Sequence, residues 1–320
     1  MTEKGITAGV DLGGTKIQTV VVRDRHVVGQ ARRPTPQTGA ADVVAAILET
    51  IKESVSGAKA ALDEVQAVGV GTPGQVDTEA GTVRAASNIA GFDKVVALGP
   101  ELSNGVGGQP VVLDNDVRMA MLGEHKRGAG RPYKDLLGVF VGTGVGGGIV
   151  LGGRLRRGQG TAGEIGHTVV RLGGRRCPCG RRGCLEAYAG RLSMEQRARK
   201  LHTQGKPTVL FHIMKREGAD RMTSGVIAHA LKQGDDLMTE LIEEAVQALG
   251  AGIASAQNLL DVEAVILGGG LADKLGPPFV TRVESAMEPH VFAVGRKPKL
   301  LPSELGDLSG AVGAAVAAGG

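Results

Sequence analysis

Four short apolar segments end in glycine-rich turns, and their order along the chain predicts the frame of the fold. With their turns they are AGVDLGGTK (8–16), AVGVGTPGQ (67–75), GVFVGTGVGGG (138–148) and AVILGGG (264–270). The first and third run directly into a further apolar segment, IQTVVV and IVL, which is typical of a β-hairpin. The second and fourth segments are not followed by a further apolar segment. One hairpin and one simple strand end in each half indicate a duplicated α/β unit.

Apolar residues at helical spacing lie between these strands. Asp42 is expected to cap a helix that ends before Gly57 and carries one apolar stripe: Val43, Ile47, Leu48, Ile51 and Val55. The strand-like PVVLDND precedes a helical pattern over 117–127, and Ser193 with Gln196 fits a capping box. A longer stripe consists of Leu237, Leu241, Ala245, Leu249 and Ile253. Strands alternating with helices predict an α/β fold with largely buried sheets.

Composition narrows the class of protein. A chain of 320 residues allows one large domain or two modest ones, and 42% hydrophobic residues indicate a packed globule. With no Trp, five Phe and two Tyr, the core must be aliphatic. There is no apolar run of membrane-spanning length, and MTEKGITAGVDLGGTK lacks the apolar region of a signal peptide. We therefore expect a cytoplasmic protein without a membrane partner.

The net charge of +4 is concentrated locally. Eight arginines fall within one stretch of the chain: Arg154, Arg156, Arg157, Arg171, Arg175, Arg176, Arg181 and Arg182. Such a patch could meet nucleic acid, but aromatic residues for base stacking are scarce. A solvated basic loop near an anionic small molecule is the favoured interpretation, and we expect no nucleic-acid partner.

All three cysteines, Cys177, Cys179 and Cys184, fall within eight positions, and His167 lies ten residues before the first. Disulfides are rare in the cytoplasm, so three clustered thiols are better interpreted as metal ligands. Three thiolates and one imidazole match a closed, structural Zn²⁺ site with no open position for chemistry. A chance cluster of buried cysteines and a redox-sensing cluster remain as alternatives.

The two hairpin turns are candidate phosphate sites. GTGVGG (142–147) fits G-x-G-x-x-G, but GIVLGGRL continues as a strand with a turn at Gly152-Gly153, which argues against a dinucleotide site. The chain also lacks a P-loop pattern. Bare N–H groups at a glycine-rich tip can hold an anion, and DLGGTK adds the polar side chains of Asp11, Thr15 and Lys16. Ordinary tight turns are the alternative.

The chain resembles the ROK family of sugar kinases. The resemblance rests on DLGGTK, LDNDVRMAMLGE, GTGVGGGIVLGG and GEIGH, and above all on CPCGRRGCLEA, which is similar to the family signature C-x-C-G-x-x-G-C-x-E. It covers essentially the whole chain. It implies an actin-like (ribonuclease H-like) ATPase fold with two lobes and a duplicated α/β unit. The expected lobes are 1–116, completed by a C-terminal helix 307–320, and 117–306, which carries the zinc loop.

The resemblance also implies roles for individual residues. Asp116 is the expected catalytic base, and the sugar hydroxyls are bound by Asn115, Glu164, His167 and Glu186. The triphosphate is held by Gly13, Gly14, Thr15, Lys16, Thr143 and Gly144, and the adenosine lies against Gly268, Gly269 and Gly270. Asp11 reaches Mg²⁺ through water, while Zn²⁺ is bound by His167, Cys177, Cys179 and Cys184. His167 is thus shared between zinc and sugar, and Asp114 receives no role.

From the residues alone, other interpretations stay open. Asn115 and Asp116 are favoured helix N-caps, and Glu164 and Glu186 could be solvated or paired with the nearby arginines. The resemblance favours an ATP-dependent glucokinase of glycolysis, assembled as a homodimer or homotetramer. N-acetylglucosamine, N-acetylmannosamine or fructose are alternative acceptors, and polyphosphate is an alternative donor. A repressor would carry a helix-turn-helix domain before DLGGTK, and a non-catalytic sugar sensor would be expected to lose Asp116.

Overall fold

The computed structural model describes residues 5–86, 88–293 and 295–319, and this part of the chain forms two five-stranded sheets and a two-stranded one. The first sheet has the order β3-β2-β1-β4-β7 and the second β10-β9-β8-β11-β12. The strands of the first are β1 (Ile6–Leu12), β2 (Lys16–Arg23), β3 (His26–Pro34), β4 (Val65–Thr72) and β7 (Val111–Asn115). Those of the second are β8 (Leu136–Val141), β9 (Val145–Leu151), β10 (Arg154–Arg156), β11 (Ala264–Gly268) and β12 (Lys299–Pro302). The small sheet pairs β5 (Gln75–Asp77) with β6 (Thr82–Arg84).

The two large sheets repeat one pairing pattern, which confirms the predicted duplication. In the first, β1, β2 and β3 pair antiparallel, whereas β1, β4 and β7 pair parallel. In the second, β8, β9 and β10 pair antiparallel, and β8, β11 and β12 pair parallel. Each predicted hairpin therefore stands at the start of one sheet.

The helices connect these strands and cover the sheets. They are α1 (Ala40–Gly57), α2 (Leu98–Gly105), α3 (Asp116–Arg127), α4 (Glu186–Ala189), α5 (Arg191–Thr203), α6 (Leu210–Arg216), α7 (Ser224–Lys232), α8 (Asp236–Leu260), α9 (Gly269–Leu275), α10 (Pro277–Met287) and α11 (Ser309–Gly319). The stripe predicted over 237–253 is buried along α8, and its aliphatic side chains join the largest apolar cluster. Each buried Leu or Ile stabilises the fold by roughly 1.5–3 kcal/mol.

Two predicted helix starts are wrong. α1 begins two residues before Asp42, whose carboxylate accepts a hydrogen bond from the Thr38 hydroxyl, and Gly57 is the last residue inside the helix. Ser193 lies inside α5 and is buried. The first N–H groups of α5 instead donate to the carbonyls of Gly142 and Thr143 at the β8–β9 turn. A tertiary contact therefore replaces the predicted capping box.

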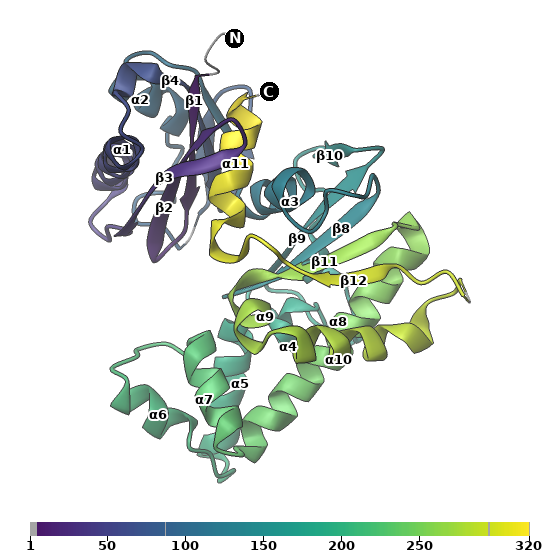
Figure 1. Ribbon diagram of the computed structural model, residues 1–320. Coiled ribbons are helices and arrows are strands. Elements are labelled where there is room, and N and C mark those ends of the chain that lie inside the picture. The colour runs from purple at the N-terminus through teal and green to yellow at the C-terminus, as the bar shows by residue number, and fades with distance from the viewer. Residues whose placement is uncertain (1–4, 87, 294, 320) are drawn as a thin grey trace.

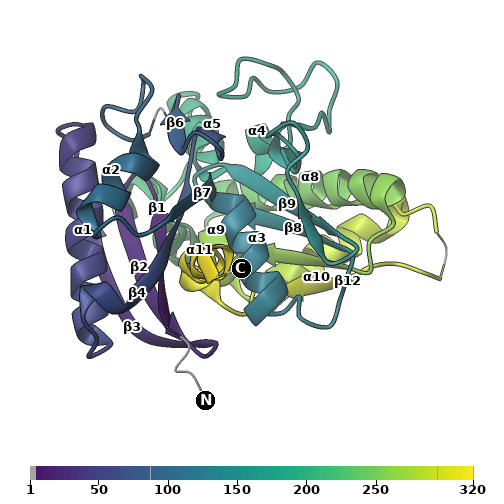
Figure 2. The ribbon, with the colours of Figure 1, turned by 90° about the horizontal axis from the view of Figure 1, so that it is seen from above.

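Two helices separate the sheets. α11 packs against β1, β4 and β2 on one side and against α3 on the other, while α3 also packs against β9 (Figures 1 and 2). The approach of α11 to the first sheet is close, because a Cβ at Gly69 would lie 1.9 Å from the Ala314 carbonyl oxygen. α1 contacts β2 and β3, whereas α8 and α10 pack together beside the second sheet (Figure 1).

Within the described part of the chain, no helix combines the length and the apolar character that crossing a membrane requires.

Candidate active site and metal centre

The strand β7 delivers Asn115 and Asp116 to the start of α3. Asn115 is the N-cap, and its side-chain oxygen accepts hydrogen bonds from the N–H groups of Val117 (3.1 Å) and Arg118 (3.2 Å). The Asp116 carboxylate accepts a hydrogen bond from its neighbour Val117 at 2.9 Å. The capping role considered for this pair thus belongs to Asn115. The side-chain NH₂ of Asn115 and the second oxygen of Asp116 are available for a ligand.

A cavity of about 240 Å³ lies beside Asp116. Among the residues predicted to hold the nucleotide, it is lined by Asp11, Lys16, Gly269 and Gly270, together with Gly142 of the β8–β9 turn. The Lys16 ammonium is 2.9 Å from the Asp307 carboxylate, which also lines the cavity. The other predicted nucleotide contacts stand outside this lining: Gly13, Gly14, Thr15, Thr143, Gly144 and Gly268.

Burial raises the pKa of two of the carboxyl groups that line this cavity, those of Asp116 and Asp11. Desolvation, with a smaller contribution from the negative charge of Glu164, raises the pKa of Asp116 to about 6, although the Val117 N–H and Arg118 act in the opposite direction. Desolvation also raises the pKa of Asp11 to about 7, the charge of Asp116 adding to it and Lys16 opposing it. A carboxylate with a pKa near the working pH is well suited to general-base catalysis.

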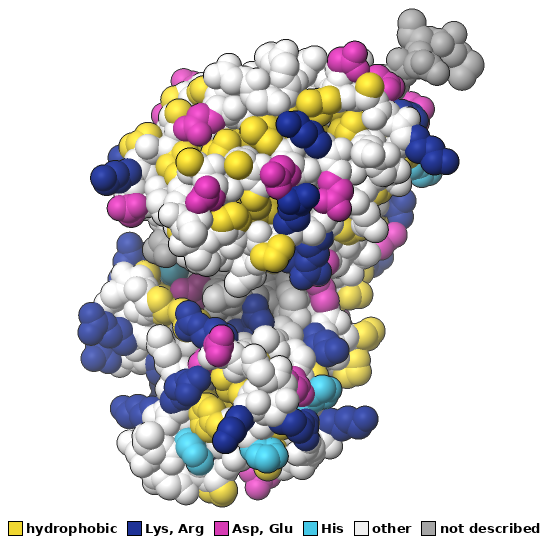
Figure 3. Space-filling model, turned by 90° about the vertical axis from the view of Figure 1, so that its left-hand side faces the viewer, with side chains coloured by type: hydrophobic (Ala, Val, Ile, Leu, Met, Phe, Trp, Pro, Cys, Tyr) yellow, Lys and Arg dark blue, Asp and Glu magenta, His cyan; other side chains and the backbone are white. Residues whose placement is uncertain are grey.

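A second cavity, of about 770 Å³, is lined on one side by Arg118, Arg157 and Glu164 and on the other by residues around β5 and β6. Glu164 directly precedes a short 3₁₀ helix, Ile165–His167. A space-filling view shows the molecule hollowed between its upper and lower halves, with Lys and Arg side chains over the lower half (Figure 3). Arg118 and Glu164 line the cavity of about 770 Å³, whereas Asp116, two residues before Arg118, lines the cavity of about 240 Å³.

The four predicted metal ligands come together. Ligand atoms of His167, Cys177, Cys179 and Cys184 all lie within 4.8 Å of one another. The sulfur atoms of Cys179 and Cys184 are 3.8 Å apart, and the Cys177 sulfur is 3.9 Å from His167 Nδ1. A tetrahedral Zn²⁺ ion with bonds of about 2.3 Å to sulfur separates two sulfur ligands by about 3.8 Å. The donor set and its spacing therefore fit zinc, and Nε2 of His167 is available to another partner.

Glu186 joins this cluster to the β8–β9 turn. One carboxylate oxygen accepts a hydrogen bond from the Val145 N–H at 3.0 Å, and the other is 3.5 Å from the Cys177 sulfur. Arg191, at the start of α5, donates to the Thr143 hydroxyl at 3.2 Å. The segment after the third cysteine thus supports the glycine-rich turn, a contact that the sequence motifs did not predict.

The chain is similar to known proteins over nearly its whole length. A family model described as "ROK family" matches residues 7–319. The chain belongs to the ROK family. It is 33% identical over 316 residues to a glucokinase of Streptomyces coelicolor, covering 97% of this chain and 96% of that protein. It is 34% identical to a glucokinase of Thermotoga maritima, covering 90% and 93%.

A solved structure extends the comparison to three dimensions. The ROK family glucokinase from Streptomyces griseus, in complex with glucose and AMPPNP, is 34% identical to this chain. The match covers 98% of this chain and 99% of that one, with a TM-score of 0.82. The expected actin-like fold with its duplicated α/β unit is confirmed.

The sequence motifs did not predict several ion pairs that the structure of this member of the ROK family shows. Asp114, which received no role, is buried between two arginines, Arg118 and Arg157. Arg118 stands four residues after Asp114, but Asp114 belongs to β7 and not to α3, so helical spacing did not predict this pair. Asp307 pairs with Lys16 across 291 residues, and the local sequence gave no sign of it.

Proposed function

We propose that this chain is an ATP-dependent glucokinase that transfers the γ-phosphoryl group to the 6-hydroxyl of glucose. The observation that carries the proposal is the position of Asp116, whose pKa is raised to about 6: it lines the cavity of Lys16 and stands two residues before Arg118, which lines the cavity of Glu164. Support comes from relatives named glucokinase across nearly the whole chain and from the glucose and AMPPNP complex of the Streptomyces griseus protein.

In this proposal Asp116 is the general base. Phosphoryl transfer needs an aligned acceptor oxygen, neutralised charge and a base near the hydroxyl, and little covalent help. Asp116 accepts the proton of the 6-hydroxyl, while Asn115, Glu164, His167 and Glu186 bind the remaining hydroxyls. The Val117 N–H and the N-terminus of α3 orient the base and stabilise its ionised form.

In this proposal the nucleotide occupies the cavity that Lys16 lines. Backbone N–H groups at Gly14, Thr15, Thr143 and Gly144 hold the triphosphate. Gly13, whose own N–H donates to the Lys16 carbonyl, lets the turn approach it closely, and Gly268, Gly269 and Gly270 lie against the adenosine. Lys16 exchanges its contact with Asp307 for phosphate oxygens. Asp11 would hold Mg²⁺ through water. When bound, this ion neutralises charge on the phosphate oxygens.

Zinc has a structural role in this proposal. His167, Cys177, Cys179 and Cys184 fill all four positions of a tetrahedral site, so the site supplies no nucleophile. Its function is to hold the segment from Glu164 to Glu186. His167, whose Nδ1 lies 3.9 Å from the Cys177 sulfur, would hold the metal through this nitrogen and would leave Nε2 for the sugar.

We also propose where the enzyme acts, how the chain divides into two lobes and how the subunits assemble. We infer a cytoplasmic enzyme of glycolysis without nucleic-acid or membrane partners. We further infer a smaller lobe of 1–116 completed by 307–320, a larger lobe of 117–306, and assembly as a homodimer or homotetramer. Light scattering coupled to size exclusion tests the assembly, and a monomer at micromolar concentration would contradict it.

The decisive experiment is a coupled assay of several sugars with each donor. Glucose with ATP is expected to give the highest kcat/KM and to yield glucose 6-phosphate. N-acetylglucosamine, N-acetylmannosamine and fructose are the competing acceptors, and polyphosphate is the competing donor. Higher kcat/KM with any of these reassigns the substrate. No turnover with any combination overturns the enzyme proposal.

A further inference from the structure

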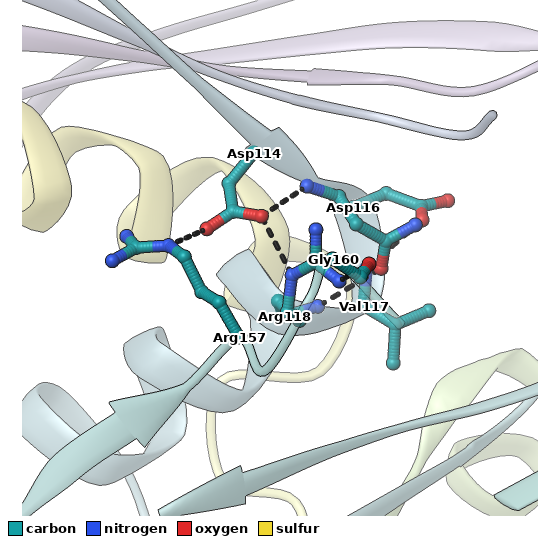
Figure 4. A network of polar contacts seen from close by, with 7 residues as sticks. Asp114, Asp116, Val117, Arg118, Arg157 and Gly160 are labelled. Atoms are coloured by element: carbon teal, nitrogen blue, oxygen red, sulfur yellow. Dashed lines mark hydrogen bonds and ion pairs between the residues drawn. The ribbon is translucent and has the colours of Figure 1, made fainter. Parts of the chain in front are cut away.

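Asp114, at the end of β7, is a fully buried carboxylate held by two arginines. Its side chain is 0% exposed. One oxygen accepts hydrogen bonds from Arg118 Nε at 2.6 Å and from the Asn115 N–H at 2.8 Å, and the other accepts one from Arg157 Nε at 2.6 Å (Figure 4). Charge-assisted bonds of this length are among the strongest in proteins.

The network joins segments that the chain keeps apart. Arg157 follows β10 of the second sheet, whereas Asp114 ends β7 of the first, 43 residues earlier. Arg118, in the first turn of α3, also donates to the Gly160 carbonyl at 2.7 Å. The segment 157–163 is therefore attached at two points to the junction of β7 and α3, once through Asp114 and once through Arg118, and this junction carries Asp116. The next residue after the segment is Glu164.

The attached segment has little conformational preference of its own. Gly158, Gly160 and Gly163 adopt φ values of +56°, +102° and +93°, which glycine adopts readily and other residues only rarely. Within it, Gly160 and Ala162 donate to the Arg157 carbonyl, which forms a compact turn. Arg157 and Arg118 hold its first half to the junction of β7 and α3, while Gly163 at its end packs against the backbone of Gly147 in β9.

The charges of the adjoining cavity argue against an anion site. Arg84, Arg118 and Arg157 line it together with Asp77, Glu79 and Glu164, and Asp114 adds a further buried negative charge. Arg118 is 3% exposed, with donors already committed to Asp114 and Gly160. A buried ion pair contributes little net stability compared with apolar packing, and a specific geometry is its better-attested benefit.

We propose that Asp114, Arg118 and Arg157 form a positioning network that fixes Glu164 relative to the base Asp116 and thereby sets the affinity for the sugar. This inference rests on the sugar-kinase function proposed above. Arg118 and Glu164 are also the two side chains whose charges act on the pKa of Asp116, in opposite directions. The three residues act through Glu164 and are not themselves catalytic.

The test compares Arg157→Ala with Arg156→Ala, its exposed neighbour on β10. Misplacing a binding group by about 1 Å can cost on the order of a hundredfold. We expect Arg157→Ala to raise the glucose KM and the calorimetric glucose Kd about tenfold, because water competes for the half-exposed Arg157 and Arg118 still holds Gly160. The KM for ATP should stay within about twofold, and Arg157→Lys should recover part of the loss.

A double-mutant cycle with Glu164→Gln separates positioning from a general loss of stability. If Arg157 acts through Glu164, then Arg157→Ala should change glucose affinity by about twofold or less in the Glu164→Gln background. An undiminished tenfold effect there overturns the inference, as does an Arg157→Ala variant that matches Arg156→Ala. Failure of the wild-type protein to phosphorylate any sugar defeats the proposed function instead, and the two failures are distinguishable.

Discussion

Glu186 accepts a hydrogen bond from the Val145 N–H across 41 residues and places its second oxygen 3.5 Å from the Cys177 sulfur. One carboxylate thus contacts both the metal-binding loop and the glycine-rich turn expected to hold phosphate. We therefore expect movement of the loop to be transmitted to the turn and to the proposed sugar-binding groups. This contact gives the cysteine cluster a mechanical connection to the active site.

Loss of a zinc ligand should weaken sugar binding without removing a sugar contact. The purified protein should contain about one zinc per chain. Cys184→Ser should lose this metal and raise the glucose Kd on the order of tenfold, because Glu164, His167 and Glu186 lose their support. Elemental analysis and calorimetry measure both quantities. A zinc-free Cys184→Ser protein that binds and phosphorylates glucose normally would contradict the bracing role.

His167→Ala should do more damage than Cys184→Ser, because it removes a metal ligand and a sugar contact together. The double variant should be less than additive in glucose affinity, since both changes act through one unit. Treatment of the wild type with a chelator should reproduce the effect of Cys184→Ser. Fully additive losses would show that zinc and sugar are bound independently.

Asp116→Asn should abolish turnover and leave glucose binding largely intact. The amide has nearly the same shape but cannot accept the proton, and a missing general base costs about 10²–10⁴-fold in kcat. Rapid-quench kinetics and calorimetry give the two quantities separately. A kcat within tenfold of the wild-type value would remove Asp116 from the role of base.

Activity should fall as the pH is lowered through about 6. The pKa of Asp116 is raised to about 6, so below this pH the base is protonated and inactive, and above it the base is free to accept a proton. Glu164→Gln removes a negative charge that raises this pKa, so it should move the acidic limb of kcat/KM to lower pH. A limb that stays in place in this variant would argue against Asp116 as the titrating group.

The buried Glu124 of α3 should be important for stability. Its carboxylate accepts hydrogen bonds from the backbone N–H groups of Ala129, Glu304 and Leu305 and from the Ser309 hydroxyl, and so holds the segment before α11. Glu124→Ala leaves these donors without their acceptor and should lower the free energy of unfolding by about 3 kcal/mol. Denaturant titration measures this. Glu101→Ala, at an exposed position of α2, is the control and should change it by less than about 0.5 kcal/mol.

The sequence by itself determined the elements whose signals are local. Glycine-rich turns between apolar segments predicted both hairpins, because turn geometry and burial are set within a few residues. The cysteine cluster is equally local: Cys177, Cys179 and Cys184 lie in one loop whose own turns bring the thiols together. The Asn115-Asp116 pair was placed correctly at the end of a strand and the start of a helix.

Only the tertiary structure decided the contacts between segments that are far apart in the chain. The start of α5 was misplaced because its N–H groups bond the carbonyls of Gly142 and Thr143, which no local pattern reveals. The bonds from Arg157 to Asp114, from Lys16 to Asp307 and from the Val145 N–H to Glu186 likewise depend on how the sheets and helices pack. Each pairs ordinary polar residues that are far apart in the chain. Their energy comes from proximity and burial, which exist only once the apolar cores have fixed the positions of the strands.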